Sequence, residues 1–153
     1  MNADRRRLEL DRITKSIVGC AYKVSNTLGA GFVEKVYENA LVLELQKAGL
    51  KTEQQYPIRV KYDGVVVGEF SADLLVEQSV IVELKAMKNF DEVHVAQCMN
   101  YPKATGLPVC LLVNFGKPKA EVRRIVQDFQ FPICVYLRSS AVPKRLFGLQ
   151  SKI

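Results

Sequence analysis

The amino-acid sequence predicts a single α/β domain, and three observations predict it. Apolar side chains recur at helical spacing through the first third of the chain, and from Tyr56 to Tyr62 they alternate with polar ones. A nearly continuous apolar run covers 109–115, which is typical of a strand buried on both faces. The 153 residues, 48% of them hydrophobic, suffice for one core and are few for two. We expect this core in about 8–137 and a peripheral tail in about 138–153.

Two helices are predicted first. Apolar positions three and four apart indicate a helix over about 8–28, which Gly29 is expected to cap. The same spacing indicates a second helix over about 33–48, with Gly49 as a natural stop. The chain therefore begins with a helical layer before any strand appears.

Strands follow where the apolar period changes to two. The first is predicted over 56–62, and Asp63-Gly64 is a turn signal that leads into a second over about 67–76. A short turn separates the second from a third over about 80–87. Connections this short indicate an antiparallel meander.

The remaining elements complete the order α-α-β-β-β-α-β-β. A third helix is predicted over about 91–104, and Gly106 and Pro108 end it. The buried strand over 109–115 comes next. Beyond it, the segments 121–126 and 131–137 can supply further strands, and the first of them completes this order.

Composition excludes several classes of function. The four cysteines lie far apart in apolar stretches, which disfavours disulfides and zinc. His94 is the only histidine, so a metal site with two histidines of this chain is excluded. No G-x-x-x-x-G-K-[ST] loop for triphosphates is present, and no spacing supports a cysteine hydrolase. The net charge of +6 is compatible with nucleic-acid binding and equally with a solvated basic surface.

The sequence also predicts where the protein works. No apolar run approaches the roughly 20 residues that cross a bilayer. The charged start of the chain lacks the apolar centre of a secretory signal. We expect a soluble, cytoplasmic protein that does not associate with membranes.

The strongest chemical signal is a pair of charges within a buried-strand sequence. Glu83 and Lys85 interrupt apolar residues and, being two apart, project from one face of the strand. Asp73 interrupts the preceding strand ten positions earlier, so an antiparallel pairing brings it opposite or diagonal to Glu83. Two facing carboxylates favour a cation between them, and their oxygens suit Mg²⁺ or Mn²⁺. The alternative is an edge strand whose charges are solvated.

The helices offer further candidates. Glu34 and Tyr37 share a helix face directly after a glycine-rich turn; alone, Glu34 equally suits a first-turn acid that complements the helix dipole. His94, Gln97 and Tyr101 share a stripe on the third helix, and alone they suit a polar helix face.

Taken together, these residues resemble a known pattern. Asp73, then Glu83-Leu84-Lys85, then Gln97-x-x-x-Tyr101 resemble the PD-(D/E)XK nuclease superfamily, particularly branches with a Q-x-x-x-Y helix. The segment Gly31-Phe32-Val33-Glu34-Lys35-Val36-Tyr37 resembles the signature of the GxxExxY protein family, usually placed in that superfamily. The similarity runs from about 13 to 126 and includes Asn114-Phe115-Gly116. A short D…ExK match is weak alone, whereas these elements in order are specific.

The resemblance implies a restriction-endonuclease-like core (α-β-β-β-α-β), a mixed sheet flanked by helices, with an acidic cleft for the metal. Asp73 and Glu83 would be the principal ligands of Mg²⁺ or Mn²⁺, and Glu34 a further ligand or water anchor. Lys85 would lie by the attacking water, and Gln97 and Tyr101 would orient substrate or the lysine. The resemblance adds Tyr37 and His94 as expected substrate contacts.

Two departures from the family pattern matter. Pro102 stands where the family usually has leucine after the tyrosine, and a proline there removes a backbone donor and can kink the helix. Cys110 stands where similar sequences often have glycine. Neither touches the carboxylates, so the departures bear on the placement of Tyr101.

The function expected from this pattern is metal-dependent hydrolysis of phosphodiester bonds in DNA. The alternative is a catalytically inactive nucleic-acid-binding or adaptor module that retains the fold, since a fold does not guarantee turnover. A small-molecule or protein-interaction role reached by reuse of the fold is a further rival. A homodimer, or a protein partner that targets the chain, stays open.

Overall fold

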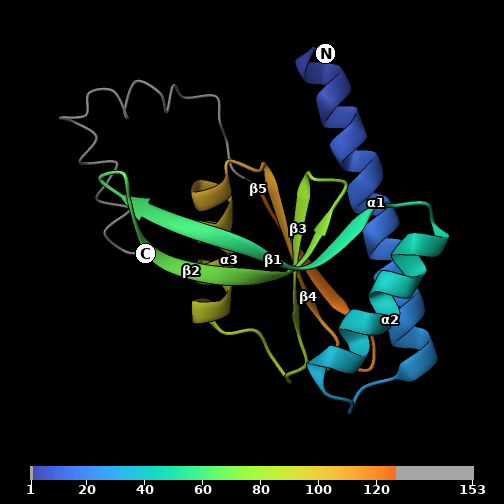
Figure 1. The fold of residues 1–153 in the computed structure, drawn as a ribbon. Helices are drawn as coiled ribbons and strands as arrows, with labels where there is room; N and C mark the ends of the chain where they lie inside the picture. Colours follow the sequence, from blue (N-terminus) through green and yellow to red (C-terminus); the bar gives the residue numbers. More distant parts are fainter. Residues whose placement is uncertain (1, 127–153) are drawn as a thin grey trace.

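A computed structural model describes residues 2–126 of the protein (Figure 1). The order of its elements confirms the predicted α-α-β-β-β-α-β-β. These are α1 (Ala3–Leu28), α2 (Glu34–Lys47), β1 (Thr52–Tyr62), β2 (Val65–Val76), β3 (Val80–Lys85), α3 (Glu92–Thr105), β4 (Val109–Asn114) and β5 (Glu121–Val126). The strand predicted over 131–137 and the predicted tail lie outside the described residues.

The five strands form one mixed sheet in chain order, β1-β2-β3-β4-β5. β1, β2 and β3 are antiparallel neighbours, which confirms the predicted meander, and β5 runs antiparallel to β4. β3 and β4 are parallel, because α3 carries the chain back between them. The predicted α/β class is confirmed, and the strand that begins at Val109 is buried throughout.

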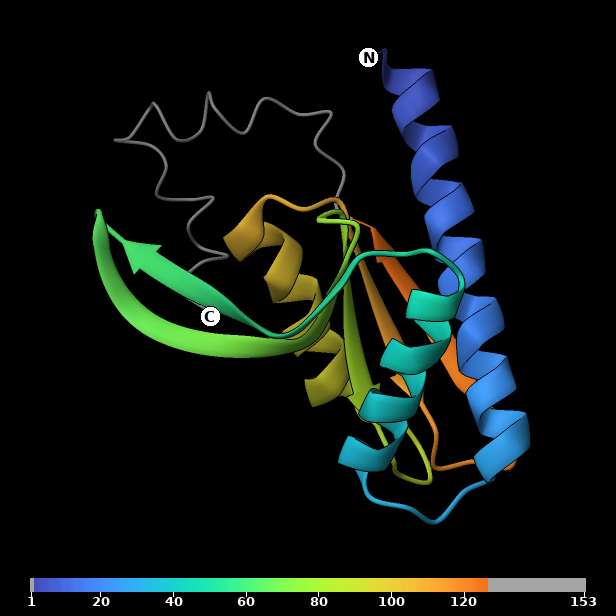
Figure 2. The ribbon, with the colours of Figure 1, turned by 45° about the vertical axis from the view of Figure 1, so that its right-hand side comes forward.

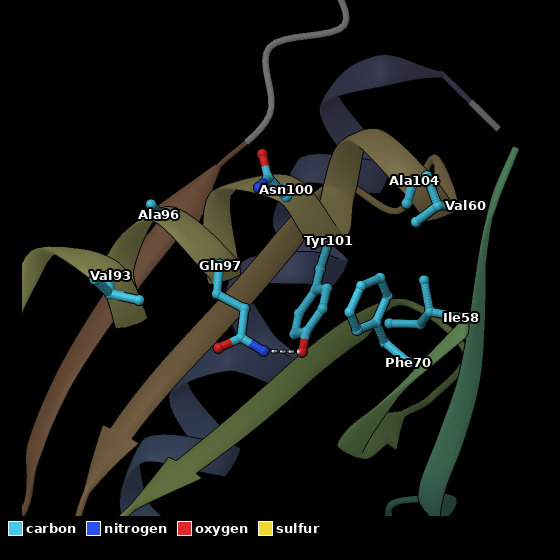
Figure 3. Close-up of a pocket in the computed structure, with 9 residues that line it drawn as sticks. All are labelled: Ile58, Val60, Phe70, Val93, Ala96, Gln97, Asn100, Tyr101 and Ala104. Carbon is cyan, nitrogen blue, oxygen red and sulfur yellow. Dashed lines mark hydrogen bonds between the residues drawn. The ribbon is translucent and has the colours of Figure 1, made fainter. Parts of the chain in front are cut away.

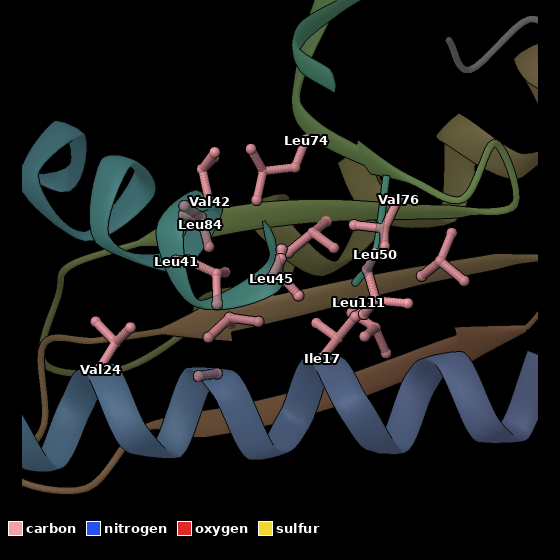
Figure 4. Packing of buried hydrophobic residues seen from close by; sticks show 14 of the residues in the cluster. Ile17, Val24, Leu41, Val42, Leu45, Leu50, Leu74, Val76, Leu84 and Leu111 are labelled. Atoms are coloured by element: carbon pink, nitrogen blue, oxygen red, sulfur yellow. The ribbon is translucent and has the colours of Figure 1, made fainter. Parts of the chain in front are cut away.

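Helices cover both faces of the sheet, as Figures 1 and 2 show. α1 and α2 pack on one face, where Ile17, Leu41 and Leu45 meet Leu74 and Leu111 (Figure 4). α3 covers the other face over a smaller core. No helix among residues 2–126 is long and apolar enough to cross a bilayer.

β1 and β2 form a long hairpin that leaves the sheet and curls around α3 (Figure 2). Residues two apart in a regular strand share a face, yet Ala72 packs in the α3-side core and Leu74 in the opposite core. In β1, Gln54 pairs with Leu74 and Tyr56 pairs with Ala72. Gln55, between them, is left out of the pairing and has a left-handed φ of 52°. The hairpin therefore changes face at Asp73, which lies between Ala72 and Leu74.

Several elements differ from their predicted bounds. α1 begins at Ala3 because the side chain of Asn2 caps it, accepting a 2.8 Å hydrogen bond from the Arg5 amide. Its first turns are exposed, so they carry no apolar period. α3 continues through Pro102 to Thr105, and Gly106 ends it in the left-handed conformation, as predicted. β3 ends at Lys85, two residues before the predicted end.

The chain after β3 is fastened to the end of β4. Asn114 Oδ1 accepts from the Met87 amide at 3.0 Å and from the Gly116 amide at 2.9 Å, while Nδ2 donates to the Met87 carbonyl at 2.8 Å. Gly116 lies so close that an added Cβ would come within 2.2 Å of the Met87 carbonyl oxygen. The Asn114–Gly116 segment therefore fixes the backbone just beyond Lys85.

Gly116→Ala is expected to destabilise the fold by about 1–3 kcal/mol, the usual cost of forcing atoms into a packed site. Urea unfolding of the parent and the variant measures this difference. Gly19→Ala is the matched control, because a Cβ at Gly19 meets no atom within 4 Å. Equal stability of the parent and Gly116→Ala would contradict the close contact.

Candidate active site

Two carboxylates are inserted where the β2–β3 ladder stops. Its last backbone pair is Leu74 with Val82, so Asp73 and Glu83 occupy the next, opposed positions. Glu83 Oε1 accepts from the Asp73 amide at 3.0 Å, and Asp73 Oδ2 accepts from the Leu84 amide at 2.7 Å. Each acid thus replaces a carbonyl of the ladder, and the opposed placement predicted for the two carboxylates is confirmed.

Burial makes this pair electrostatically unusual. Glu83 is only 5% exposed, and burial, followed by the charge of Asp73, raises the pKa of Glu83 to about 8. Burial also raises the pKa of Asp73, although the Leu84 amide opposes the rise. Adjacent carboxylates with raised pKa values are poised to take up either protons or a cation.

Lys85 and Glu34 lie beside the pair. The positive charge of Lys85 opposes the rise in the pKa of both Asp73 and Glu83. The Lys85 side chain is half-buried. Glu34, exposed at the first turn of α2, accepts from the Ala86 amide at 3.3 Å. Its charge contributes to the raised pKa of Glu83. The structure therefore gathers Glu34, Asp73, Glu83 and Lys85 around the end of β3.

Gln97 and Tyr101 approach from α3. Gln97 Nε2 donates to the Tyr101 hydroxyl at 2.8 Å, as Figure 3 shows. Burial and then the charge of Glu83 raise the pKa of Tyr101. Tyr101 belongs to the α3-side core with Ile81, and Glu83, two residues after Ile81, shares that face of β3. Tyr101 lies one turn before Gly106 in an unbroken α3, so Pro102 does not remove the helix that positions it.

Tyr37 lies where no substrate can reach it. The Tyr37 ring is fully buried and stacks on Phe115, with centroids 4.7 Å apart. Its hydroxyl donates to the Gly29 carbonyl at 2.6 Å and accepts from the Phe32 amide at 3.2 Å. The expectation that Tyr37 contacts substrate is therefore wrong, because its ring has no exposed surface. Tyr37 instead fixes the turn that leads into α2.

His94 lies at the start of α3, where the Asp91 side chain caps the helix by accepting from the His94 amide at 3.1 Å. The imidazole Nδ1 is 2.9 Å from Asp91 Oδ1 without the alignment of a hydrogen bond. None of the contacts described for residues 2–126 joins this imidazole to the carboxylates. The expected substrate contact of His94 thus stays a prediction.

Glu38 is a site residue that the sequence analysis missed. It is a nearly fully buried carboxylate on α2, and it accepts from Gln54 Nε2 at 2.7 Å, Gln55 Nε2 at 3.1 Å and Lys35 Nζ at 3.0 Å. Gln55 lies beside Asp73 and lowers its pKa, whereas the charge of Glu38 raises it. The signal available in the sequence is the spacing of four from Glu34, which places both acids on one helix face.

The donor set fits a hard cation in its chemistry. Asp73 and Glu83 are adjacent carboxylates whose mutual repulsion a divalent ion would relieve, and carboxylate oxygens are what Mg²⁺ and Mn²⁺ prefer. Within residues 2–126, no three Asp, Glu, His or Cys side chains lie close enough together to hold a metal ion between them. Glu34 is turned toward the Ala86 amide, so the expected third ligand is near the pair without joining it.

Comparison with known proteins bears on this arrangement. Residues 11–125 match the family described as the PD-(D/E)XK nuclease superfamily. The chain belongs to the PD-(D/E)XK nuclease superfamily.

A search of curated proteins found no match. Two solved structures match the PD-(D/E)XK domain described here. One is an alkaline exonuclease (LHK-Exo) from Laribacter hongkongensis, with 14% identity, a TM-score of 0.44, and coverage of 86% of this chain and 87% of that chain. The other is LHK-Exo in complex with dAMP, with 13% identity, a TM-score of 0.45, and coverage of 91% and 93%.

In a metal-chelating buffer, the stability of the parent is expected to fall relative to Glu83→Gln as the pH rises from 4.5 to about 8. The folded PD-(D/E)XK domain holds the Glu83 proton up to the higher pH, so within this window it binds more protons than the unfolded chain. The stabilisation is complete below 4.5 and is lost as the pH rises through 8. Thermal unfolding at several pH values measures it, and parallel curves for the two proteins would contradict the raised pKa.

Proposed function

We propose that this chain is a Mg²⁺- or Mn²⁺-dependent nuclease that hydrolyses phosphodiester bonds, and that its substrate is DNA. Membership of the nuclease superfamily supports hydrolysis of nucleic acid. The observation that carries the proposal is the pair formed by half-buried Asp73 and buried Glu83 at the end of β3, with Lys85 beside it. Two carboxylates this close repel each other when both are charged, so the pair is suited to holding a cation.

Each residue has a role in this proposal. Asp73 and Glu83 hold the divalent ion, which supplies an activated water and stabilises charge on the phosphate. Lys85 orients the water or stabilises the developing negative charge. The Gln97–Tyr101 pair orients the substrate or the lysine from the α3 side. Glu34, exposed and adjacent, is a further ligand or anchors water.

The net charge and the Gly31–Tyr37 segment support two finer parts of the proposal, the polyanionic substrate and the narrower family. The net charge of +6 favours a polyanionic substrate, because each basic group that contacts a phosphate releases counterions. The Gly31–Tyr37 segment favours placement in the GxxExxY family. Within this segment, Tyr37 fixes the turn and Glu34 accepts from the Ala86 amide near the acids. We propose cytoplasmic action, with a homodimer or a targeting partner as open arrangements.

A second function has one specific observation in its favour. One oxygen of each carboxylate already accepts a backbone amide, which holds β2 and β3 together without a metal. A nucleic-acid-binding or adaptor module that keeps the fold and lacks catalysis would use the acids in this structural way alone. The cleavage experiment separates the two functions.

Asp73→Ala, Glu83→Ala and Lys85→Ala are each expected to abolish metal-stimulated DNA cleavage. The first two lose a ligand, and the third loses the cation beside the water. Cleavage of labelled single- and double-stranded DNA with Mg²⁺, Mn²⁺ or EDTA measures this. Glu53→Ala is the matched control, because it removes an exposed acid of β1.

Circular dichroism must show that the variants remain folded. Parent-like cutting by folded Asp73→Ala and Glu83→Ala would overturn the proposed site. Absence of cutting by the parent, together with nucleic-acid binding that survives in both variants at full strength, would favour the non-catalytic module.

Glu38→Ala is expected to weaken Mn²⁺ binding about 10- to 100-fold, the usual effect of losing a group that orients a ligand. Without Glu38, Gln55 loses the acceptor that holds it beside Asp73. Glu38→Gln retains an acceptor oxygen and should restore part of the affinity. Titration calorimetry measures the dissociation constants.

Glu44→Gln is the control for the Glu38 series, since Glu44 lies on the same helix and its ion pairs are with Lys23 and Lys47. An unchanged Mn²⁺ affinity in a folded Glu38→Ala protein would show that Glu38 serves the fold alone.

A further inference from the structure

An apolar groove lies between α3 and the curled β1–β2 hairpin (Figure 3). Its volume is about 380 Å³. Ile58 and Phe70, which are paired in the hairpin, form one wall together with Val60. Gln97, Asn100 and Tyr101 line the α3 side.

The groove lies on the same face of the sheet as Glu83. Gln97 and Tyr101 line the groove, and Tyr101 belongs to the α3-side core together with Ala72 and Ile81. Glu83 follows Ile81 by two residues in β3, so it shares that strand face. On β2, Phe70 is three residues before Asp73, at the point where the hairpin leaves the sheet. A phosphodiester held at Asp73 and Glu83 would therefore have the groove beside it.

The lining has the chemistry of a base pocket. Phe70 lies at the groove wall and is 46% exposed, so its ring is available for stacking. The side-chain amides of Gln97 and Asn100 present both donors and acceptors, which suit the edge of a nucleobase. The described lining residues carry no charge, so the groove suits a flat, uncharged group rather than a phosphate.

We propose that this groove binds an unpaired nucleobase next to the phosphodiester bond that is cut. The inference rests on the proposed nuclease function and names its substrate class: nucleic acid that is single-stranded, or frayed, at the point of cleavage. A base within a duplex would first have to leave its stack and its partner, at a cost of a few kcal/mol. Substrates whose bases are already free avoid that cost.

The position of the groove favours a base over an apolar protein segment. A nucleotide chain fixed by its phosphate at the carboxylates necessarily brings a base to the adjoining surface. Aromatic stacking accepts any base, so sequence selectivity is expected to be weak, with the Gln97 and Asn100 amides giving modest preferences. A protein segment would need a further apolar surface to anchor it.

The test compares two ligands of equal length and charge: a single-stranded oligothymidylate and a fully abasic deoxyribose-phosphate chain. Their dissociation constants are measured by fluorescence anisotropy in EDTA, so binding is assessed without turnover. The parent is expected to bind the base-bearing chain about tenfold more tightly. Phe70→Ala should remove most of this preference and leave the affinity for the abasic chain unchanged.

The control variant is Val65→Ala, which shortens another exposed side chain of β2 outside the groove. With Mn²⁺, the parent should also cut single-stranded DNA faster than a blunt duplex of the same sequence. Because Phe70 is half-exposed, its loss should leave thermal unfolding nearly unchanged.

Equal affinity of the parent for the two chains would overturn the inference, as would equal losses for both chains in Phe70→Ala. A change of oligomeric state in Phe70→Ala, without a change in oligonucleotide affinity, would assign the groove to a protein contact instead. If the parent cuts nothing yet prefers the base-bearing chain, the groove assignment stands and the nuclease function fails. If the parent cuts DNA but does not prefer the base-bearing chain, the nuclease function stands and the groove assignment fails.

Discussion

The reciprocal bonds between Asp73 and Glu83 are the constraint on which the site depends. Beyond Leu74 and Val82 the backbone ladder ends, and the two side chains continue it through the amides of Asp73 and Leu84. An unpaired buried amide is costly, so these carboxylates keep β2 and β3 in register as well as carrying charge. The carboxylates of Asp73 and Glu83 thus serve both the candidate site and the pairing of the two strands.

The surroundings follow from this constraint. α2 brings Glu34 and Glu38 to the edge of the pair, and the buried Tyr37 holds the turn before that helix. From the other face, α3 supplies the Gln97–Tyr101 bond. Asn114 and Gly116 fix the backbone that follows Lys85. Three segments distant in sequence therefore converge on one end of β3.

Periodicity and turn signals in the sequence predict the elements well, because burial of one face imposes a spacing on apolar residues. The opposition of Asp73 and Glu83 followed from the short β2–β3 connection. The first turns of α1 escaped prediction because they are exposed and depend on the Asn2 cap. Glu38 was missed for a different reason: its partners Gln54 and Gln55 lie on β1, and only the folded chain brings them together.

Tyr37 illustrates the limit of assigning roles by motif. The spacing of Glu34 and Tyr37 places both on one side of α2, yet one is exposed and the other fully buried. Motif membership indicates that a residue matters, and burial decides whether it acts on a ligand or on the backbone.

The hairpin has a consequence for how such a domain can diversify. Its inner half is tied to the sheet at Leu74–Val76, whereas its outer half projects past the last β3 pair and meets α3. Insertions or exchanges near Asp63 and Gly64 would alter the projecting arm while leaving the acids in place. In the function proposed above, the part that selects the substrate could therefore change separately from the part that cuts it.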